Sequence, residues 1–207
     1  MAGIGLDIQE VIDELGVSVE ILRSPVNLTE KIIYEMNSQA TKPFIREFHR
    51  DGSFSNTTNI TTGDVLHIIT TNEYMLVMNK TPDMFENEVV EYASVLYKCN
   101  FAPPSKISRP GPQVRDANYN LTESWIDVVP NAYGIIADKL QGTNIDQEEP
   151  VGQIQIWAIE AFIPASYAIQ PLDRLYISST EYYKIEKVER YRYPGILALD
   201  LVEDTRP

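Results

Sequence analysis

The chain of 207 residues is poor in the side chains that build metal centres and nucleophilic active sites, with one cysteine, Cys99, and two histidines, His49 and His67. A single cysteine excludes an intrachain disulfide and a cysteine cluster for zinc. Both histidines lie in strand-like runs without a Ser or Cys in a recognisable nucleophile context, and no His-Glu-x-x-His pattern occurs. We therefore predict that the protein is not an enzyme and uses no metal or cofactor. A hydrolase built on two distant carboxylates stays open as an alternative.

Long apolar runs are also missing. No segment approaches the roughly 18 consecutive apolar residues that a membrane span needs. Residues 1–7 contain neither the basic segment nor the apolar stretch of a signal peptide, so we expect synthesis and folding in the cytoplasm. Hydrophobic residues make up 43% of the chain and charged residues 23%, which is typical of a folded protein without a membrane partner.

Basic side chains are scarce relative to acidic ones, because 17 Lys and Arg stand against 30 Asp and Glu, a formal net charge of −13. Tight binding to nucleic acid depends on Lys and Arg that displace counterions from phosphates. The composition therefore argues against a protein whose main work is to grip DNA. It fits an acidic channel through which DNA passes without tight binding, and it fits equally well a charge that only keeps the protein dispersed.

The sequence does contain a pattern that occurs twice. Residues 63–77 have an acidic turn residue, Asp64, then an alternating apolar run, a polar turn and a second run that opens with Tyr74. Residues 172–188 repeat this order with Asp173 and Tyr182. Alternation places every second side chain on one face of a strand, so each copy predicts a β-hairpin with one buried face. Each copy also predicts a further strand, and these strands cover residues 88–99 and 196–202.

The repeat predicts two modules. The first covers residues 1–101 and the second residues 119–207, with a Pro-rich linker or loop over residues 102–118. A short helix over residues 7–15 opens the first module, because apolar residues recur there at helical spacing, and Gly16 is expected as its left-handed cap. We expect the helix to cover its own barrel, and docking on a neighbouring subunit is the alternative. The apolar face of this helix consists of Ile8, Val11, Ile12 and Leu15.

Other segments complete the predicted fold, which is mainly β, with two tandem related small β-barrel or sandwich modules and a short N-terminal α-helix. Residues 51–58 are rich in turn-forming residues and predict a polar loop or a wide hairpin. A second polar loop is predicted at 141–150, with an acidic tip rather than a calcium site. Further strands are expected at residues 17–21, 31–35, 44–49, 125–129, 133–137 and 154–163.

Two basic segments supply the candidate contact residues. Prolines remove backbone donors, so residues 102–118 are expected not to pair as a central strand. This segment is locally basic, which indicates either contact with DNA phosphate or an acidic partner, or only a solvated linker. Residues 184–193 interleave Arg with Tyr, a mixture suited to stacking on bases or to a protein interface. The candidates are Lys106, Arg109, Arg115, Arg190, Tyr191, Arg192 and Tyr193.

The second copy of the repeat resembles a known family. Residues 171–177, Pro-Leu-Asp-Arg-Leu-Tyr-Ile, lead into residues 181–185, Glu-Tyr-Tyr-Lys-Ile, and the segment ends at residues 201–204, Leu-Val-Glu-Asp. This order is similar to that in head-closure (stopper) and neck proteins of tailed bacteriophages, whose usual members have a single module. The resemblance implies a structural virion protein at the head-tail junction. It would form a homo-oligomeric ring below the portal or adaptor protein, close the DNA-filled head and provide the platform for the tail.

The duplication leads to a hypothesis about symmetry. Six subunits, each with two similar modules, would present twelve near-equivalent surfaces to a twelvefold portal and remain sixfold toward the tail. A ring of twelve copies is the alternative, and closed rings of either size use heterologous contacts. Within the virion, a tail-terminator or baseplate position competes with the neck. An oligonucleotide-binding β-barrel protein is the alternative from another class.

Overall fold

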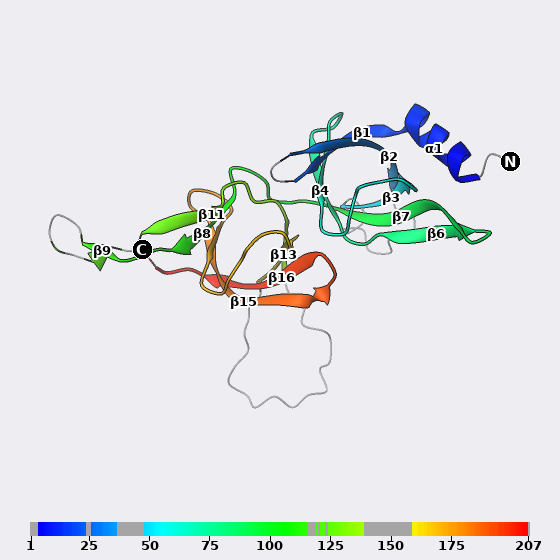
Figure 1. Ribbon diagram of the computed structural model, residues 1–207. Helices are drawn as coiled ribbons and strands as arrows, with labels where there is room; N and C mark the ends of the chain where they lie inside the picture. Colours follow the sequence, from blue (N-terminus) through cyan, green and yellow to red (C-terminus); the bar gives the residue numbers. More distant parts are fainter. Residues whose placement is uncertain are drawn as a thin grey trace.

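The computed structural model describes residues 4–23, 26–36, 48–115, 119, 121–122, 124–138 and 159–206. It shows a mainly β protein in which two modules lie beside each other, with one helix at the N-terminal end (Figure 1). The first module is a closed β-barrel and the second a curled half-barrel. The predicted fold class is therefore confirmed.

The first module consists of one helix and seven strands. Six of the strands close into an antiparallel barrel, because the sheet order β3-β2-β1-β4-β5-β7 is completed by pairing of β3 with β7. Strand β6 lies outside this ring and pairs with β7. The elements are α1 (Ile4–Leu15), β1 (Val17–Leu22), β2 (Leu28–Met36), β3 (His49–Ser55), β4 (Val65–Ile68), β5 (Glu73–Val77), β6 (Thr81–Phe85) and β7 (Glu88–Lys98).

Strand β3 occupies most of the segment predicted to be a polar loop, so that prediction was wrong for residues 51–55. Its inner face is formed by Gly52 and Phe54, which are buried, while Asp and Ser residues face outward. A Cβ on Gly52 would lie 3.1 Å from the Leu96 side chain, so the glycine leaves room for core packing. The outward residues give the segment the composition of a loop, but Phe54 fills the barrel core and fixes the strand.

The second module is an open sheet of seven strands in the order β11-β8-β14-β15-β16-β13-β12. Two short strands, β9 and β10, form a separate hairpin. The strands are β8 (Lys106–Pro110), β9 (Val114–Arg115), β10 (Leu121–Thr122), β11 (Trp125–Val129), β12 (Ile135–Asp138), β13 (Ile159–Pro164), β14 (Arg174–Tyr176), β15 (Tyr182–Tyr193) and β16 (Ile196–Glu203).

The two modules share one strand plan in one chain order. Strands β1, β2, β3, β4, β5 and β7 correspond to β8, β11, β13, β14, β15 and β16. In both sets the first strand pairs with the second and fourth, the fourth with the fifth, and the sixth with the fifth and third. One pairing differs. In the barrel the second strand, β2, pairs with the third, β3. In the half-barrel the corresponding strands β11 and β13 do not pair, because β12 lies beside β13 instead. The repeated hairpins predicted from the sequence are β4–β5 and β14–β15.

Strand β8 lies within the segment predicted to be a linker, and this prediction was also wrong for residues 106–110. The strand pairs with β11 on one side and with β14 on the other, and Ile107 and Ser108 are buried. Prolines 103 and 104 precede the strand and Pro110 ends it, so residues 106–109 keep their backbone donors. The second module therefore begins before residue 119, the boundary expected from the sequence.

A shared cluster of buried side chains joins the modules. Val65 and Leu76 of the barrel pack with Ile135 and Ile196 of the half-barrel. The rings of Tyr74 and Tyr133 lie 4.9 Å apart across this junction. The two backbones also meet directly, since a Cβ on Gly63 (φ 88°) would lie 1.8 Å from the carbonyl oxygen of Gly195. Only glycines allow this approach, so the modules are fitted to each other rather than loosely linked.

Helix α1 begins three residues earlier than predicted and packs against β7, β2 and β3 of its own module. Only part of the predicted apolar face is covered, because Ile12 is buried whereas Leu15 is 75% exposed. Gly16 lacks the left-handed conformation that was expected of it, since Gly63 and Gly195 are the described glycines with positive φ. Its N–H donates to the Ile12 carbonyl (2.9 Å), and a Cβ would lie 2.2 Å from that oxygen.

Some predictions fall outside the described residues, namely most of the strand at 44–49, the loop at 141–150 and the first half of the strand at 154–163. The strands predicted at 17–21, 31–35, 88–99, 125–129, 133–137 and 196–202 are confirmed as β1, β2, β7, β11, β12 and β16. Among the described residues, the one helix is too short and too polar to cross a membrane.

Candidate functional site

The acidic turn residues that mark the repeat each hold an arginine at one end of a module. In the barrel, Arg23 follows β1 and donates from Nε and Nη2 to the two carboxylate oxygens of Asp64, at 2.9 and 2.5 Å. The backbone N–H of Thr61 donates to the same carboxylate (2.6 Å), and Gly63 with φ 88° completes the turn. The pair ties the end of β1 to the start of β4.

The half-barrel repeats this device. Arg109 of β8 donates from Nε and Nη2 to the two carboxylate oxygens of Asp173, at 2.8 and 2.9 Å. Gln170 N–H donates to Asp173 (2.8 Å), three residues before it as in the first copy, and Leu172 has φ 76° where the barrel has Gly63. The hydrogen bond from Arg109 to Asp173 raises the pKa of the guanidinium above its ordinary value. Arg109, a candidate contact for DNA, therefore has a structural partner.

A second cluster of arginines lies beside Trp125 of β11 on the half-barrel. Asp204 accepts from Arg174 Nε (2.7 Å) and from Arg206 Nε (2.8 Å). Both guanidinium groups stack on Trp125, with centroid distances of 3.8 Å for Arg174 and 5.0 Å for Arg206. Burial alone would raise the pKa of Asp204, but the hydrogen bonds from Arg206 and Arg174 outweigh it and hold the pKa well below its ordinary range. The cluster fixes residues 204–206 against β11 and β14.

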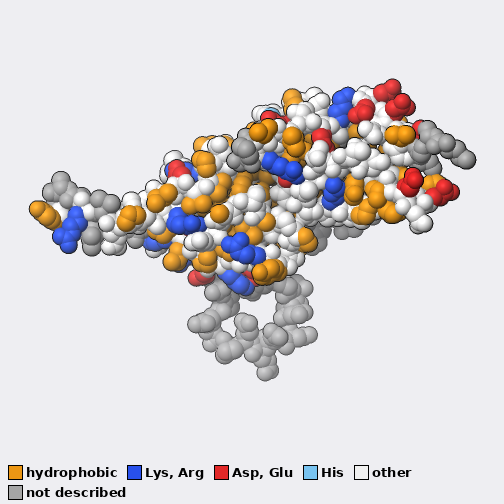
Figure 2. Space-filling view, viewed as in Figure 1, with side chains coloured by type: hydrophobic (Ala, Val, Ile, Leu, Met, Phe, Trp, Pro, Cys, Tyr) orange, Lys and Arg blue, Asp and Glu red, His pale blue; other side chains and the backbone are white. Residues whose placement is uncertain are grey.

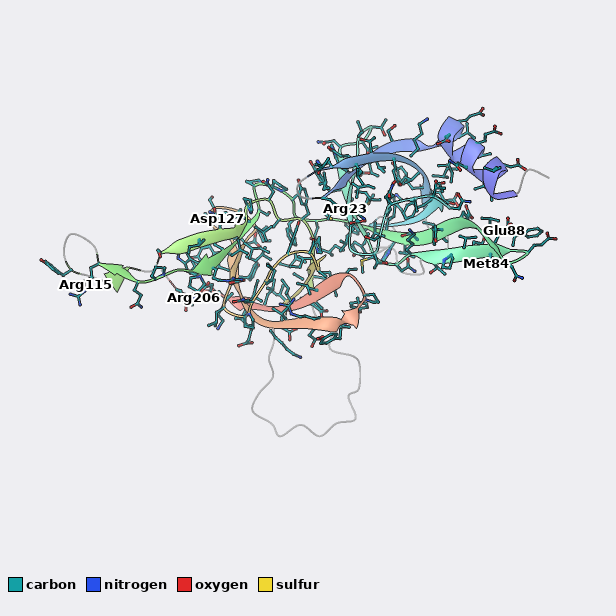
Figure 3. The ribbon with its side chains drawn as sticks, in the orientation of Figure 1. Arg23, Met84, Glu88, Arg115, Asp127 and Arg206 are labelled. Atoms are coloured by element: carbon teal, nitrogen blue, oxygen red, sulfur yellow. The ribbon has the colours of Figure 1, made fainter. Side chains whose placement is uncertain are left out.

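The remaining candidates from the Pro-rich segment lie apart from each other. Lys106 on β8 pairs with Asp127 of β11 (3.0 Å). Hydrogen bonds from Ser108 and Lys106 lower the pKa of Asp127. Arg115 ends β9 on the hairpin that projects from the half-barrel, where it is exposed (Figure 3). The structure thus separates Arg115 from Lys106 and Arg109 and does not form a single basic patch from the three.

Of the four candidates on β15, three contact other parts of the protein and one is fully exposed. Arg190 donates to the Ile169 carbonyl (2.7 Å), and Arg192 pairs with Glu160 of β13. Tyr193 packs edge-on against Phe162, with centroids 5.7 Å apart. Tyr191 is 98% exposed. Of the four side chains, Tyr191 is therefore the one that is presented fully to a partner.

A cleft lies where the modules meet, with a volume of about 570 Å³. Its lining includes Arg23 from the barrel, Asn131 and Tyr133 from the β11–β12 connection, and Tyr167 from the turn after β13. The Tyr133 N–H donates to the Tyr167 hydroxyl (3.3 Å), and burial raises the pKa of Tyr167. Arg23 already binds Asp64. These groups do not combine a nucleophile with a base that would activate it.

The histidines have structural surroundings. His67 bonds through Nε2 to Asn72 (2.8 Å) and stacks on Tyr74 at 4.8 Å. His49 lies edge-on to Tyr97 at 4.4 Å, and burial lowers the pKa of His49. Within the described ranges, no group of three or more His, Cys, Asp or Glu side chains is arranged to hold a metal ion.

The two ends of the molecule differ in charge, a feature that was not among the predictions from the sequence. Figure 2 shows acidic side chains gathered over α1 and the β6–β7 turn, at the end opposite the half-barrel. Neither residues 4–15 nor residues 81–88 contain Lys or Arg. The exposed carboxylates there are those of Asp7, Glu10, Asp13, Glu14, Asp83, Glu86 and Glu88. The sequence does show the acids, but only the fold brings the two segments to one end.

No protein-family model matches the sequence, and no curated protein matches it either. Among solved structures, the chain matches the crystal structure of YcgR in complex with c-di-GMP from Escherichia coli, at 9% identity and a TM-score of 0.20. The match covers 96% of this chain and 81% of that chain. A likeness of this degree supports no inference about the fold or the ligands of this protein.

Proposed function

We propose that this protein is a structural component of the neck of a tailed bacteriophage, where copies of it form a ring between the portal or adaptor and the tail. The ring closes the DNA-filled head and is the platform to which the tail attaches. It binds its neighbours and catalyses no reaction. Its partners are further copies of itself, the portal or adaptor protein above, and tail-terminator or other tail proteins below.

The observation that carries this proposal is the two-module plan. The residues that resemble the neck family, 170–206, form one continuous part of the half-barrel from the Asp173 turn through β14, β15 and β16. The barrel contains the same turn, the same arginine pair and, apart from the pairing of β2 with β3, the same strand pairings. A chain with two similar modules suits a sixfold ring that must meet a twelvefold portal, because six subunits supply twelve similar modules.

The charge distribution supports a channel through which DNA moves and not a protein that binds DNA tightly. Three arginines that were candidates for phosphate contact, Arg109, Arg190 and Arg192, already bind carboxylate or carbonyl groups of the protein. Using them for phosphate would require breaking these bonds. Together with the net charge of −13, this favours a ring through which DNA moves over an oligonucleotide-binding barrel.

Immunolabelling of intact phage particles tests the proposal. Particles whose genome encodes this chain are labelled with an antibody against it and imaged by electron microscopy. Label at the head-tail junction is the expected result, followed by a count of six copies per particle. Label at the tail tip would move the protein to the baseplate, and absence from particles would reject a virion role. Twelve copies at the junction would reject only the six-subunit ring.

A further inference from the structure

The end of the barrel farthest from the half-barrel has an exposed apolar surface. Strand β6 has one hydrogen-bonded neighbour among the described strands, β7, and all five of its residues are exposed. Met84 and Phe85 lie at its tip, and a turn with positive φ at Glu86 and Asn87 holds the hairpin in a fixed shape. We call the β6–β7 tip, residues 81–88, together with α1, the acidic end.

The opposite end of the molecule is complementary. The half-barrel carries two exposed apolar residues, Ile126 and Leu172, and two partly exposed arginines, Arg109 and Arg206, and we call these four residues the arginine end. Ile126 lies directly across from Arg109 between β11 and β8, and Arg206 donates to the Leu172 carbonyl (3.1 Å). Ile126 and Leu172 are exposed apolar side chains. Figure 3 shows Met84 and Glu88 at the outer end of the barrel and Arg206 on the half-barrel, on the side away from them.

Burial of the carboxylates determines the charge that a partner meets at the arginine end. Asp173 and Asp204 are 1% exposed, whereas Arg109 and Arg206 are 32% and 23% exposed. The guanidinium groups therefore reach the surface while their counter-charges stay below it. Arginine beside exposed apolar residues is the composition enriched at protein interfaces.

We propose that the acidic end of one copy docks on the arginine end of the next copy. Each end has exposed apolar side chains, and the exposed charges around them are opposite, so contact buries apolar area and brings carboxylates close to guanidinium groups that keep their own buried partners. Because the two surfaces lie at opposite ends of the chain, the contact is heterologous and repeats from copy to copy. Such contacts close into a ring when the rotation between copies permits. This inference rests on the proposed function, and it names the surfaces that build the ring.

Chemical crosslinking of the full-length chain tests the contact. Met84→Cys and Ile126→Cys chains are mixed at high concentration and treated with a short bismaleimide. We expect crosslinked heterodimers, and a ladder of higher species from the chain that carries both substitutions. Because these positions lie at opposite ends of one chain, a ladder reports contact between copies. The native thiol gives little background, since burial raises the pKa of Cys99 to about 12.

Matched variants separate a specific contact from random collision. Tyr191→Cys is at a more exposed position than Met84 or Ile126 but lies outside both ends, so its mixture with Met84→Cys should give no heterodimer above the wild-type level. Asp83→Lys with Glu88→Lys should weaken association about tenfold in sedimentation experiments, whereas Glu186→Lys, on exposed β15, should leave it unchanged. No crosslink between positions 84 and 126, or equal crosslinking of 84 with 191, would overturn the proposed contact.

The two proposals fail in different ways. Label at the head-tail junction without the 84–126 crosslink would leave the neck function standing and reject this contact. The crosslink without label on particles would keep the head-to-tail contact and reject the neck. A chain that stays monomeric at every concentration, with no crosslink, would reject the contact as well.

Discussion

The closed barrel and the open half-barrel differ by one strand pairing. In the barrel, β3 pairs with both β2 and β7, and these two pairings close the ring. In the half-barrel, β12 takes the place beside β13 that β11 would need, so β11 and β12 become the two edges of the sheet. A closed barrel leaves no edge within its ring, whereas an open sheet must stabilise and protect its edges in another way.

The half-barrel meets this requirement with side chains at both edges. At the β11 edge, Trp125 stacks with Arg174 and Arg206, and Asp204 holds both arginines. At the β12 edge, the chain that leaves the barrel supplies the cover, because Phe101 bridges to Gly134 and the Asn100 side chain bonds Ile136. An open module therefore depends on specific polar contacts that its closed relative does not need.

The largest effect is expected from Asp204→Ala. This change leaves the guanidinium groups of Arg174 and Arg206 without their shared carboxylate, and the Arg174 side chain is only 5% exposed. Breaking one side of a buried ion pair costs about 3–5 kcal/mol, which should appear in the free energy of unfolding measured with urea. Lys106→Ala is the control, because the pair of Lys106 with Asp127 is exposed and is worth about 1 kcal/mol or less. Equal losses for the two variants would contradict a special role of the cluster.

The repeated arginine pairs allow a direct comparison of the modules. Asp173→Asn should cost about 1.5–3 kcal/mol, because it removes the charge that Arg109 faces and puts an amide near the Gln170 N–H. Asp64→Asn should cost less, since the Asp64 side chain is 11% exposed and that of Asp173 1%. Chemical unfolding of both variants measures the difference. A larger loss for Asp64→Asn would show that closure, not burial, sets the strength of the pair.

Acid should weaken the half-barrel through Asp204. The pKa of Asp204 in the folded protein lies below the ordinary value of about 3.9, so its stabilisation is complete above that value and is lost progressively as the pH falls below it toward the folded-state pKa. Wild-type protein should therefore lose up to about 1.4 kcal/mol more per pH unit than Asp204→Asn below about pH 4. Urea unfolding between pH 6 and pH 2.5 measures both slopes. Parallel curves for the two proteins would contradict this assignment.

The sequence predicts the local parts of this fold well. Hairpins β4–β5 and β14–β15 follow from alternation and from polar turns, which involve residues close in the chain. The role of Asp64 and Asp173 as turn residues is visible for the same reason. Their partners are not, because Arg23 lies 41 residues from Asp64 and Arg109 lies 64 residues from Asp173. Ion pairs at such separations are set by strand order, which no local pattern reports.

The errors also have physical causes. Strand β8 was not predicted because prolines flank it, although they do not interrupt it. Strand β3 was not predicted because the outward Asp and Ser residues around Phe54 have the composition of a loop. Whether β11 pairs with β13 or leaves room for β12 depends on packing between distant segments. For the surface, Asp83, Glu86 and Glu88 are visible in the sequence as acids, but their position beside α1 at one end requires the folded barrel.

The smallest effect is expected at the β12 edge. Asn100 bonds both polar groups of Ile136, donating to its carbonyl (2.6 Å) and accepting from its N–H (2.8 Å), as a neighbouring strand would. Asn100→Ala should cost about 0.5–1.5 kcal/mol in thermal unfolding and should increase self-association, because it frees an edge that can pair with another chain. Asn131→Ala, an exposed asparagine in the junction cleft, should change stability by less than about 0.5 kcal/mol. If the two variants behave alike, the bridge at Phe101 protects the edge without help from Asn100, and the open module relies on backbone pairing more than on side chains.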